Sequence, residues 1–216
     1  MNWKHLIQSI ANGRGYEIRK LPQKRVQPNE SLANTLNIDR DILARIRGHV
    51  SANPYEAVPL NELASADKWY LPECDDSKWR NMNVGFYGAW LSGPYMGVGL
   101  YRTRYTLPED MRKKHVYLHF GAADELATVY VDGKKEIEHS TGSMKVSARI
   151  VRTLPFSFEC PALADGQPHT IAVHVFNLHG LGGLYEPVSV VASDEPLDED
   201  QLWMATEPIR QARVRL

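Results

Sequence analysis

The residues best suited to chemistry in this sequence are aromatic rings gathered in one glycine-rich stretch. Residues 83–99, NVGFYGAWLSGPYMGVG, hold Phe86, Tyr87, Trp90 and Tyr95 among five glycines. Aromatic rings bind sugars by stacking on their apolar faces, while polar side chains bond the hydroxyls. A loop with this much apolar surface is normally covered by something. We therefore predict that Trp90, Tyr87 and Tyr95 stack on a ligand; the alternative is that the rings pack on the end of the domain.

Two further places in the chain offer polar groups that could orient such a ligand. Residues 177–187, NLHGLGGLYEP, contain Asn177, His179 and Tyr185. Asp132 precedes a glycine at a predicted hairpin tip. The structural interpretation is a capping histidine and an ordinary turn aspartate. The functional interpretation adds Tyr185, Asn177, His179 and Asp132 to the ligand-binding residues.

Sequence motifs for catalysis are not found. The sequence has no G-x-S-x-G elbow, no H-E-x-x-H, no P-loop and no C-x-x-C. Asp124, Glu125, Asp132 and Glu138 are close in sequence, but glycosidase chemistry needs two carboxylates at a set separation across a cleft. A structural Ca²⁺ is conceivable in a β-sandwich, yet no acidic cluster has convincing ligand spacing. We predict no catalytic residue, no cofactor and no metal ligand.

Composition excludes several classes of protein. The formal net charge is −1, which argues against a chain built to grip nucleic acid or an anionic membrane. No stretch is long and apolar enough for a transmembrane span or a signal peptide, so we expect a cytoplasmic chain or the mature part of a secreted one. Cys74 and Cys160 are too few for a disulfide framework; we expect buried free thiols, with pairing left open.

The elements that must position these residues follow from a change of hydrophobic period. From Val58 onward apolar residues alternate with polar ones, which is typical of half-buried strands. Asp132-Gly133 between two such runs is a hairpin signal. No helical pattern of 10–15 residues separates the strands, so parallel βαβ units are not expected. Many short strands at this spacing indicate a sandwich or barrel, and we predict an antiparallel β-sandwich. The clearest runs are 101–105, 116–120, 127–131 and 171–176.

The two ends of the chain differ from this middle part. Residues 1–57 are basic and punctuated by proline, and helical spacing with a closing glycine predicts one short helix near 39–47. Residues 194–216 begin with five carboxylates in seven residues, which indicates an acidic linker and tail. The predicted organisation is therefore an arm over 1–57, the sandwich over 58–193, and a tail over 194–216.

Four sequence blocks occur in order along the chain: DDSKW (75–79), GVGLYRTRYTLPED (97–110), HVYLHFGAADELATVYVDGKKEIEH (115–139) and GLGGLYEPVSVVA (180–192). This part of the chain, about residues 67–192, resembles the galactose-binding-like jelly roll that serves as the sugar-binding domain of family-two glycoside hydrolases and related β-galactosidase-like enzymes. The resemblance implies a jelly-roll fold, a carbohydrate ligand and a glycoside hydrolase catalytic domain as a further partner. A second copy of the chain is the alternative partner.

Within these blocks several residues also have evident structural roles. Trp79 and Tyr101 are large enough to plug the ends of the core, and Asp124 can bond backbone at the start of a strand. Gly182 and Gly183 permit a turn or bulge where two strands pass closely.

The sequence departs from the family pattern at two positions. Asp132 replaces the asparagine often found there, in a loop that can reach the sugar site of a neighbouring catalytic barrel, and no barrel follows in these residues. Glu186 stands where the family has a basic residue. The leading hypothesis is a non-catalytic carbohydrate-binding sandwich, accessory to or derived from a glycoside hydrolase. The alternatives are a structural or docking domain that packs on a partner or on itself, and a glycan-active hydrolase or lyase with its site on the jelly roll.

Overall fold

A computed structural model describes the part of the chain that carries the four sequence blocks. The described residues are 47–50, 55–59, 67–82, 84, 96–112, 115–178 and 182–213. They all belong to one compact unit, Ile46–Leu216. The helix predicted near 39–47 lies outside them except for its last residue, which begins a strand.

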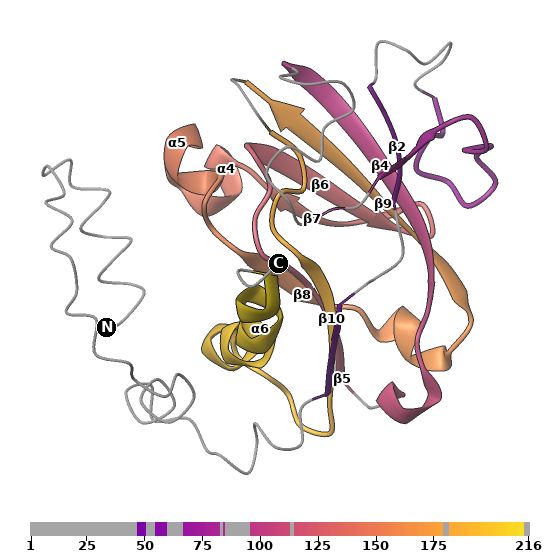
Figure 1. Ribbon diagram of the computed structural model, residues 1–216, viewed down its shortest axis with the longest axis vertical. Coiled ribbons are helices and arrows are strands. Elements are labelled where there is room, and N and C mark those ends of the chain that lie inside the picture. The colour runs from indigo at the N-terminus through magenta and orange to yellow at the C-terminus, as the bar shows by residue number, and fades with distance from the viewer. Residues whose placement is uncertain are drawn as a thin grey trace, which may run out of the picture. The chain divides into compact units, whose positions relative to one another are not determined.

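Two antiparallel sheets form a sandwich, and the predicted fold class is confirmed (Figure 1). The four-stranded sheet has the order β1 (Arg47–Val50), β10 (Val188–Ser193), β5 (His115–Phe120), β8 (Phe156–Glu159). The six-stranded sheet has the order β3 (Arg80–Met82), β2 (Tyr55–Pro59), β4 (Gly97–Thr106), β9 (Pro168–Asn177), β6 (Leu126–Val131), β7 (Lys134–His139). Strands β1 and β2 take in residues that the sequence analysis assigned to the arm, because short strands after a polar linker carry too few alternating residues to show a period.

The core lies between the two sheets and follows from the alternation in the sequence. In β6, Ala127, Val129 and Val131 are buried while the residues between them are half-buried. Phe120 of β5 stacks on Phe156 of β8 with ring centroids 4.7 Å apart. Such buried rings each contribute on the order of 3–5 kcal/mol relative to alanine. This close-packed interior fixes where the strand ends, and hence the loops, emerge.

The outer face of the six-stranded sheet is covered by residues 67–79. Arg102 of β4 is fully buried beneath this segment. Its Nε donates to Oδ2 of Asp76 at 2.9 Å, and its Nη1 donates to the carbonyls of Trp69 and Leu71. Its guanidinium also lies over the Trp79 ring, 6.0 Å from the centroid. Trp79 therefore anchors this covering segment and not an end of the core, whereas Tyr101 is buried between the sheets.

The outer face of the four-stranded sheet carries a helix. Helix α6 (Glu199–Arg213) lies against β10 and β1 in Figure 1. It starts with a reciprocal cap, in which Gln201 N donates to Oδ1 of Asp198 and Asp198 N donates to Oε1 of Gln201, both at 2.8 Å. The acidic run assigned to a linker thus includes the first turn of a helix, where carboxylates interact favourably with the helix dipole.

Short helices and tight turns complete the connections. These are η2 (Glu109–Met111), α4 (Thr141–Met144), α5 (Ala148–Val151) and η3 (Pro161–Asp165). The predicted Asp-Gly hairpin is confirmed: Asp132 and Gly133 join β6 to β7 with φ angles of 48° and 84°. Cys160 is buried and Cys74 is half-buried, and both are free thiols.

Candidate functional site

One end of the sandwich brings together three segments that are distant in sequence. The strand registers place Gly97 beside Asn177 and Leu126 beside Phe176, so β4 begins where β9 ends and β6 begins. The connection 121–125 and the described part of the connection to β10, residues 182–187, meet here. We call this region the Asp124 end.

Main-chain hydrogen bonds hold the Asp124 end in place. Asp124 N donates to the carbonyl of Gly183 at 3.0 Å, and Gly183 N donates to the carbonyl of Asp124 at 3.1 Å. Oε2 of Glu125 accepts from Leu178 N at 2.9 Å. Gly183 has a φ of 89°, which a residue with a side chain rarely adopts. The predicted hydrogen bond to backbone is therefore made by the main chain of Asp124. The carboxyl group of Asp124 takes no part in this pair of hydrogen bonds.

The carboxyl group of Asp124 has an unusual environment. The residue is 3% exposed, and among the described residues nothing hydrogen-bonds its Oδ1 atom. We call this atom the open acceptor. Its other oxygen, Oδ2, lies 3.9 Å from Nη1 of Arg152, which is an ion-pair distance without a hydrogen bond. Burial raises the pKa of Asp124 to about 6; the Arg152 guanidinium acts against this rise and Glu125 adds to it.

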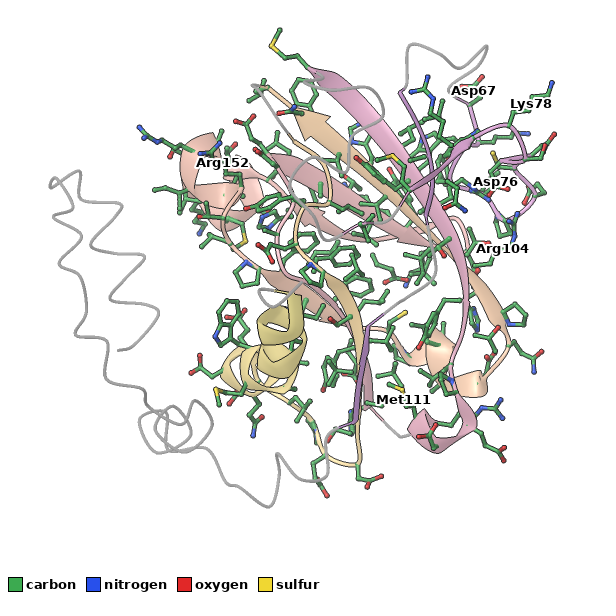
Figure 2. The ribbon with its side chains drawn as sticks, viewed as in Figure 1. Asp67, Asp76, Lys78, Arg104, Met111 and Arg152 are labelled. Atoms are coloured by element: carbon green, nitrogen blue, oxygen red, sulfur yellow. The ribbon has the colours of Figure 1, made fainter. Side chains whose placement is uncertain are left out.

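Arg152 reaches this end from the helical segment between β7 and β8. It follows α5 directly and lies beside that helix in Figure 2, on the other side of the molecule from Asp76 and Arg104. Its carbonyl accepts a hydrogen bond of 2.5 Å from the Tyr185 hydroxyl, which ties the segment to the connection before β10. The Arg152 side chain is 40% exposed, so its guanidinium remains accessible beside the buried Asp124.

Two of the predicted ligand-binding residues lie at the Asp124 end. Asn177 is the last residue of β9, and Tyr185 is held against Arg152. Both are buried, at 2% and 6% exposure. Gly182 packs so closely on Asn177 that a Cβ there would come within 2.3 Å of the Asn177 Cγ atom. In this structure the two side chains frame the site, and direct ligand contact by either remains a prediction.

Asp132 lies at the opposite end of β6. Its Oδ1 accepts from Thr170 N at 2.8 Å, and its Oδ2 lies 2.6 Å from Nδ1 of His169. The other ring nitrogen of His169 lies 2.9 Å from Oδ1 of Asp165. Since β6 spans six residues, Asp132 is separated from Asp124 by roughly 20 Å. These bonds lock a turn, and the structure does not bring Asp132 together with Asn177 or Tyr185.

The remaining predicted residues, Tyr87, Trp90, Tyr95 and His179, lie outside the described residues. Met96, the residue after Tyr95 in the aromatic stretch, is 70% exposed. It precedes the first residue of β4 and therefore lies at the Asp124 end.

The sequence analysis did not identify Arg152, or the carboxyl group of Asp124, as site residues. Asp124 could have been found from the GAAD segment of the third block, where an acid lies two residues before the half-buried strand β6. Arg152 carries no sequence signal, because only the fold brings residues 148–152 beside that strand end. In the described part of the chain, no group of three or more His, Cys, Asp or Glu residues could hold a metal ion. No helix in the described residues is long and apolar enough to cross a membrane.

Comparison with known proteins gives the fold a family context. The sequence matches no protein-family profile and no curated protein. Among solved structures, a β-glucuronidase from Bacteroides uniformis matches with a TM-score of 0.54 and 23% identity over 68% of this chain. A β-glucuronidase from Ruminococcus gnavus matches with a TM-score of 0.54 and 18% identity over 69%. A β-glucuronidase of glycoside hydrolase family 2 matches with a TM-score of 0.52 and 17% identity. The chain has the fold of one β-sandwich domain of such enzymes.

The match covers only a small share of each enzyme's length. The chain spans 18% of the Bacteroides uniformis enzyme and 30% of the Ruminococcus gnavus enzyme. The matched part is thus a minor portion of each longer protein. At these identities the similarity concerns the fold.

Proposed function

We propose that the chain is a non-catalytic carbohydrate-binding β-sandwich, accessory to or derived from a glycoside hydrolase, and that a sugar binds at the Asp124 end. The observation that carries this proposal is the open acceptor. A buried polar atom that lacks a partner within the described residues costs free energy unless a ligand or water satisfies it. A sugar hydroxyl is a donor of the right size, and a charge-assisted hydrogen bond to a carboxylate is a strong one.

The surroundings of the open acceptor support a binding site more than a chance surface feature. The main-chain pair between Asp124 and Gly183 and the bond from Tyr185 to Arg152 fix the positions of the polar groups in advance. Binding then costs little ordering entropy. Arg152 supplies exposed donors beside the open acceptor. Of two neighbouring sugar hydroxyls, one could donate to the open acceptor and the other could accept from Arg152. Met96 of the aromatic stretch lies at the Asp124 end. We expect the rings of this stretch, Trp90 above all, to provide the face on which the sugar stacks.

The similarity to β-glucuronidase domains supports the association with glycoside hydrolases. Those proteins are named as β-glucuronidases, and the matched fold forms one part of each. We extend to this chain only the carbohydrate class of ligand. No pair of carboxylates across a cleft is needed for such a role, so the proposal is for binding and not for hydrolysis.

The test is a glycan array probed with the full chain, followed by calorimetry on the glycans it retains. We expect Asp124→Ala and Trp90→Ala each to weaken binding at least 10-fold, because each removes one of the two contact types. Asp110→Asn, an exposed acid in η2 beyond the far end of β4, is the matched control and should bind normally. Failure to bind any glycan would reject carbohydrate binding, and binding by both variants as tight as that of the native chain would reject the Asp124 end as the site. Release of reducing ends or unsaturated products would favour the hydrolase or lyase alternative.

The size of the matched proteins favours a second candidate, a domain that docks on a partner chain or on itself. The sandwich corresponds to a minor part of each longer enzyme, where most of the protein lies outside it. Light scattering decides the self-association form of this alternative. A chain that stays monomeric at about 100 µM, a concentration at which weak interfaces form, counts against self-association.

A further inference from the structure

We propose that the group received by the open acceptor is a neutral hydroxyl donor, so that the site prefers neutral sugars to their uronic acid counterparts and releases a proton when it binds them in mildly acidic solution. This inference rests on the proposed function and names the ligand class of the same site. It concerns the Oδ1 atom of Asp124 and the charges around it.

The hydrogen-bonding state of Asp124 defines what the ligand must offer. Both main-chain groups of the residue are already paired with Gly183. Its Oδ2 atom faces the Arg152 guanidinium at 3.9 Å. Within the described residues the open acceptor alone is left, and an ionised carboxylate oxygen can only accept. A hydroxyl that donates to it satisfies both partners without moving any other group.

The charges at this end oppose a carboxylate ligand. Asp124 and Glu125 are consecutive acids, and Glu186 packs its Cβ against Gly121, within 2.7 Å of where a Cβ would stand there. The cation that the described residues place beside Asp124 is Arg152. A uronate in contact with Arg152 would put a second carboxylate next to the buried one, and like charges at such a distance repel strongly where water is scarce. A neutral sugar avoids this repulsion.

Proton linkage follows from the same contacts. Because burial holds the pKa of Asp124 near 6, about half of the free molecules carry a protonated Asp124 at pH 6. A hydrogen bond donated by a sugar hydroxyl stabilises the ionised form of Asp124. The pKa of Asp124 is therefore lower in the complex, and binding releases its proton. His139 on β7 is the other titratable group to separate: its Nε2 lies 2.8 Å from the Val151 carbonyl oxygen and burial lowers its pKa, and the Asp124 variants below distinguish its titration from that of Asp124. Glu125 is engaged by Leu178 N.

The affinity for a neutral sugar should change with pH by about one order of magnitude. If the bound pKa lies at about 4 or below, affinity at pH 5 is about 10-fold lower than at pH 7.5, as the protonated fraction of the free molecules requires. A uronate has the opposite dependence, because its carboxylate binds better when Asp124 is protonated and can donate.

The experiment compares matched ligands by saturation-transfer NMR. The probes are methyl β-D-galactoside and methyl β-D-glucoside, each with its C6 uronate, measured on the full chain at pH 5, 6 and 7.5. We expect neutral binding to weaken about 10-fold on acidification and the uronates to bind more weakly at pH 7.5. If no probe and no arrayed glycan binds, the proposed function itself is rejected. If a uronate binds as well as its neutral partner at pH 7.5, carbohydrate binding stands and the inference is overturned.

Two further measurements assign the effect to Asp124. Asp124→Asn keeps a carbonyl acceptor without a titration, so its neutral binding should be weaker at pH 7.5 and independent of pH. Persistence of the full pH dependence in this variant, or in a folded Asp124→Ala, would overturn the inference. The ¹³C chemical shift of the Asp124 carboxyl carbon in the native chain gives the pKa with and without sugar, which covers the case in which the variants fail to fold. An unchanged pKa on saturation with the neutral sugar also contradicts the inference.

Discussion

The Nη1 atom of Arg152 lies 3.9 Å from the Oδ2 atom of Asp124, so a buried acid and a half-exposed cation face each other without a hydrogen bond. Each residue is also held by other bonds: Arg152 through its carbonyl to Tyr185, and Asp124 through its main chain to Gly183. If the two side chains lay at hydrogen-bond distance, the Arg152 guanidinium would donate to the Asp124 carboxylate. The separation leaves each group with capacity for a third partner.

Replacing Asp124 by asparagine should stabilise the fold above pH 6. The native state binds the Asp124 proton more tightly than the unfolded state, because the pKa is raised from 3.8 to about 6. The free energy of unfolding therefore falls as pH rises between these values and stays lowered above them. We expect Asp124→Asn to gain about 2 kcal/mol at pH 7.5 and little at pH 3.5, measured by urea unfolding. Equal gains at both pH values would contradict the raised pKa.

Loss of the His169 side chain should remove an alkaline decline in stability. Burial opposes its charge, but the carboxylates of Asp132 and Asp165 prevail and raise the pKa of His169 above its ordinary value. The stabilisation is fully present below the unfolded pKa of about 6.5 and is lost as pH rises through the folded pKa. His169→Gln should lower the free energy of unfolding by about 1–3 kcal/mol at pH 6. Thermal unfolding from pH 6 to 9 should then show a smaller decline in the variant than in the native chain.

Arg102 and Arg104 should differ sharply when each is replaced by methionine. Arg102 is fully buried and bonds Asp76 and two main-chain carbonyls, so its loss leaves Asp76 with less compensation and should cost about 3–5 kcal/mol. Arg104 bonds the same carboxylate at 3.2 Å, but its side chain is 54% exposed, and we expect less than about 1 kcal/mol. Urea unfolding of the two variants checks this. Similar costs would mean that the buried pair is not what fixes residues 67–79.

An alanine at position 183 should strain the Asp124 end. The φ of 89° at Gly183 is costly for a residue with a Cβ, by about 1–2 kcal/mol. Gly142, an exposed glycine in α4 whose Cβ would meet its nearest atom at 3.7 Å, is the matched control. Gly142→Ala should be neutral or slightly stabilising. Amide exchange at Asp124 N should accelerate in Gly183→Ala only, because that donor bonds the Gly183 carbonyl.

The sequence allowed prediction of the features that depend on local pattern. Alternation identified the strands around Val129 and Val173, and the Asp132-Gly133 turn was predicted from its chemistry alone. The α6 helix was missed because its acids were interpreted only as charge, although Asp198 and Gln201 have the spacing of a reciprocal cap. Arg152 could not be predicted, since its approach to Asp124 depends on the path of the chain between β7 and β8. Local pattern fixes elements, while contacts between distant elements need the fold.

The position of β9 in the six-stranded sheet has a consequence for the chain during its synthesis. β9 lies between β4 and β6, and it pairs with both. Neither earlier strand can complete its pairing until residues 168–177 have left the ribosome, by which time both strands of the β6–β7 hairpin have already been synthesised. At translation rates of about 5–20 residues per second, β4 waits several seconds with an unpaired edge. The nascent chain is therefore most exposed to misassembly in the interval before β9 emerges, and a pause in translation between Thr106 and Asn177 would lengthen it.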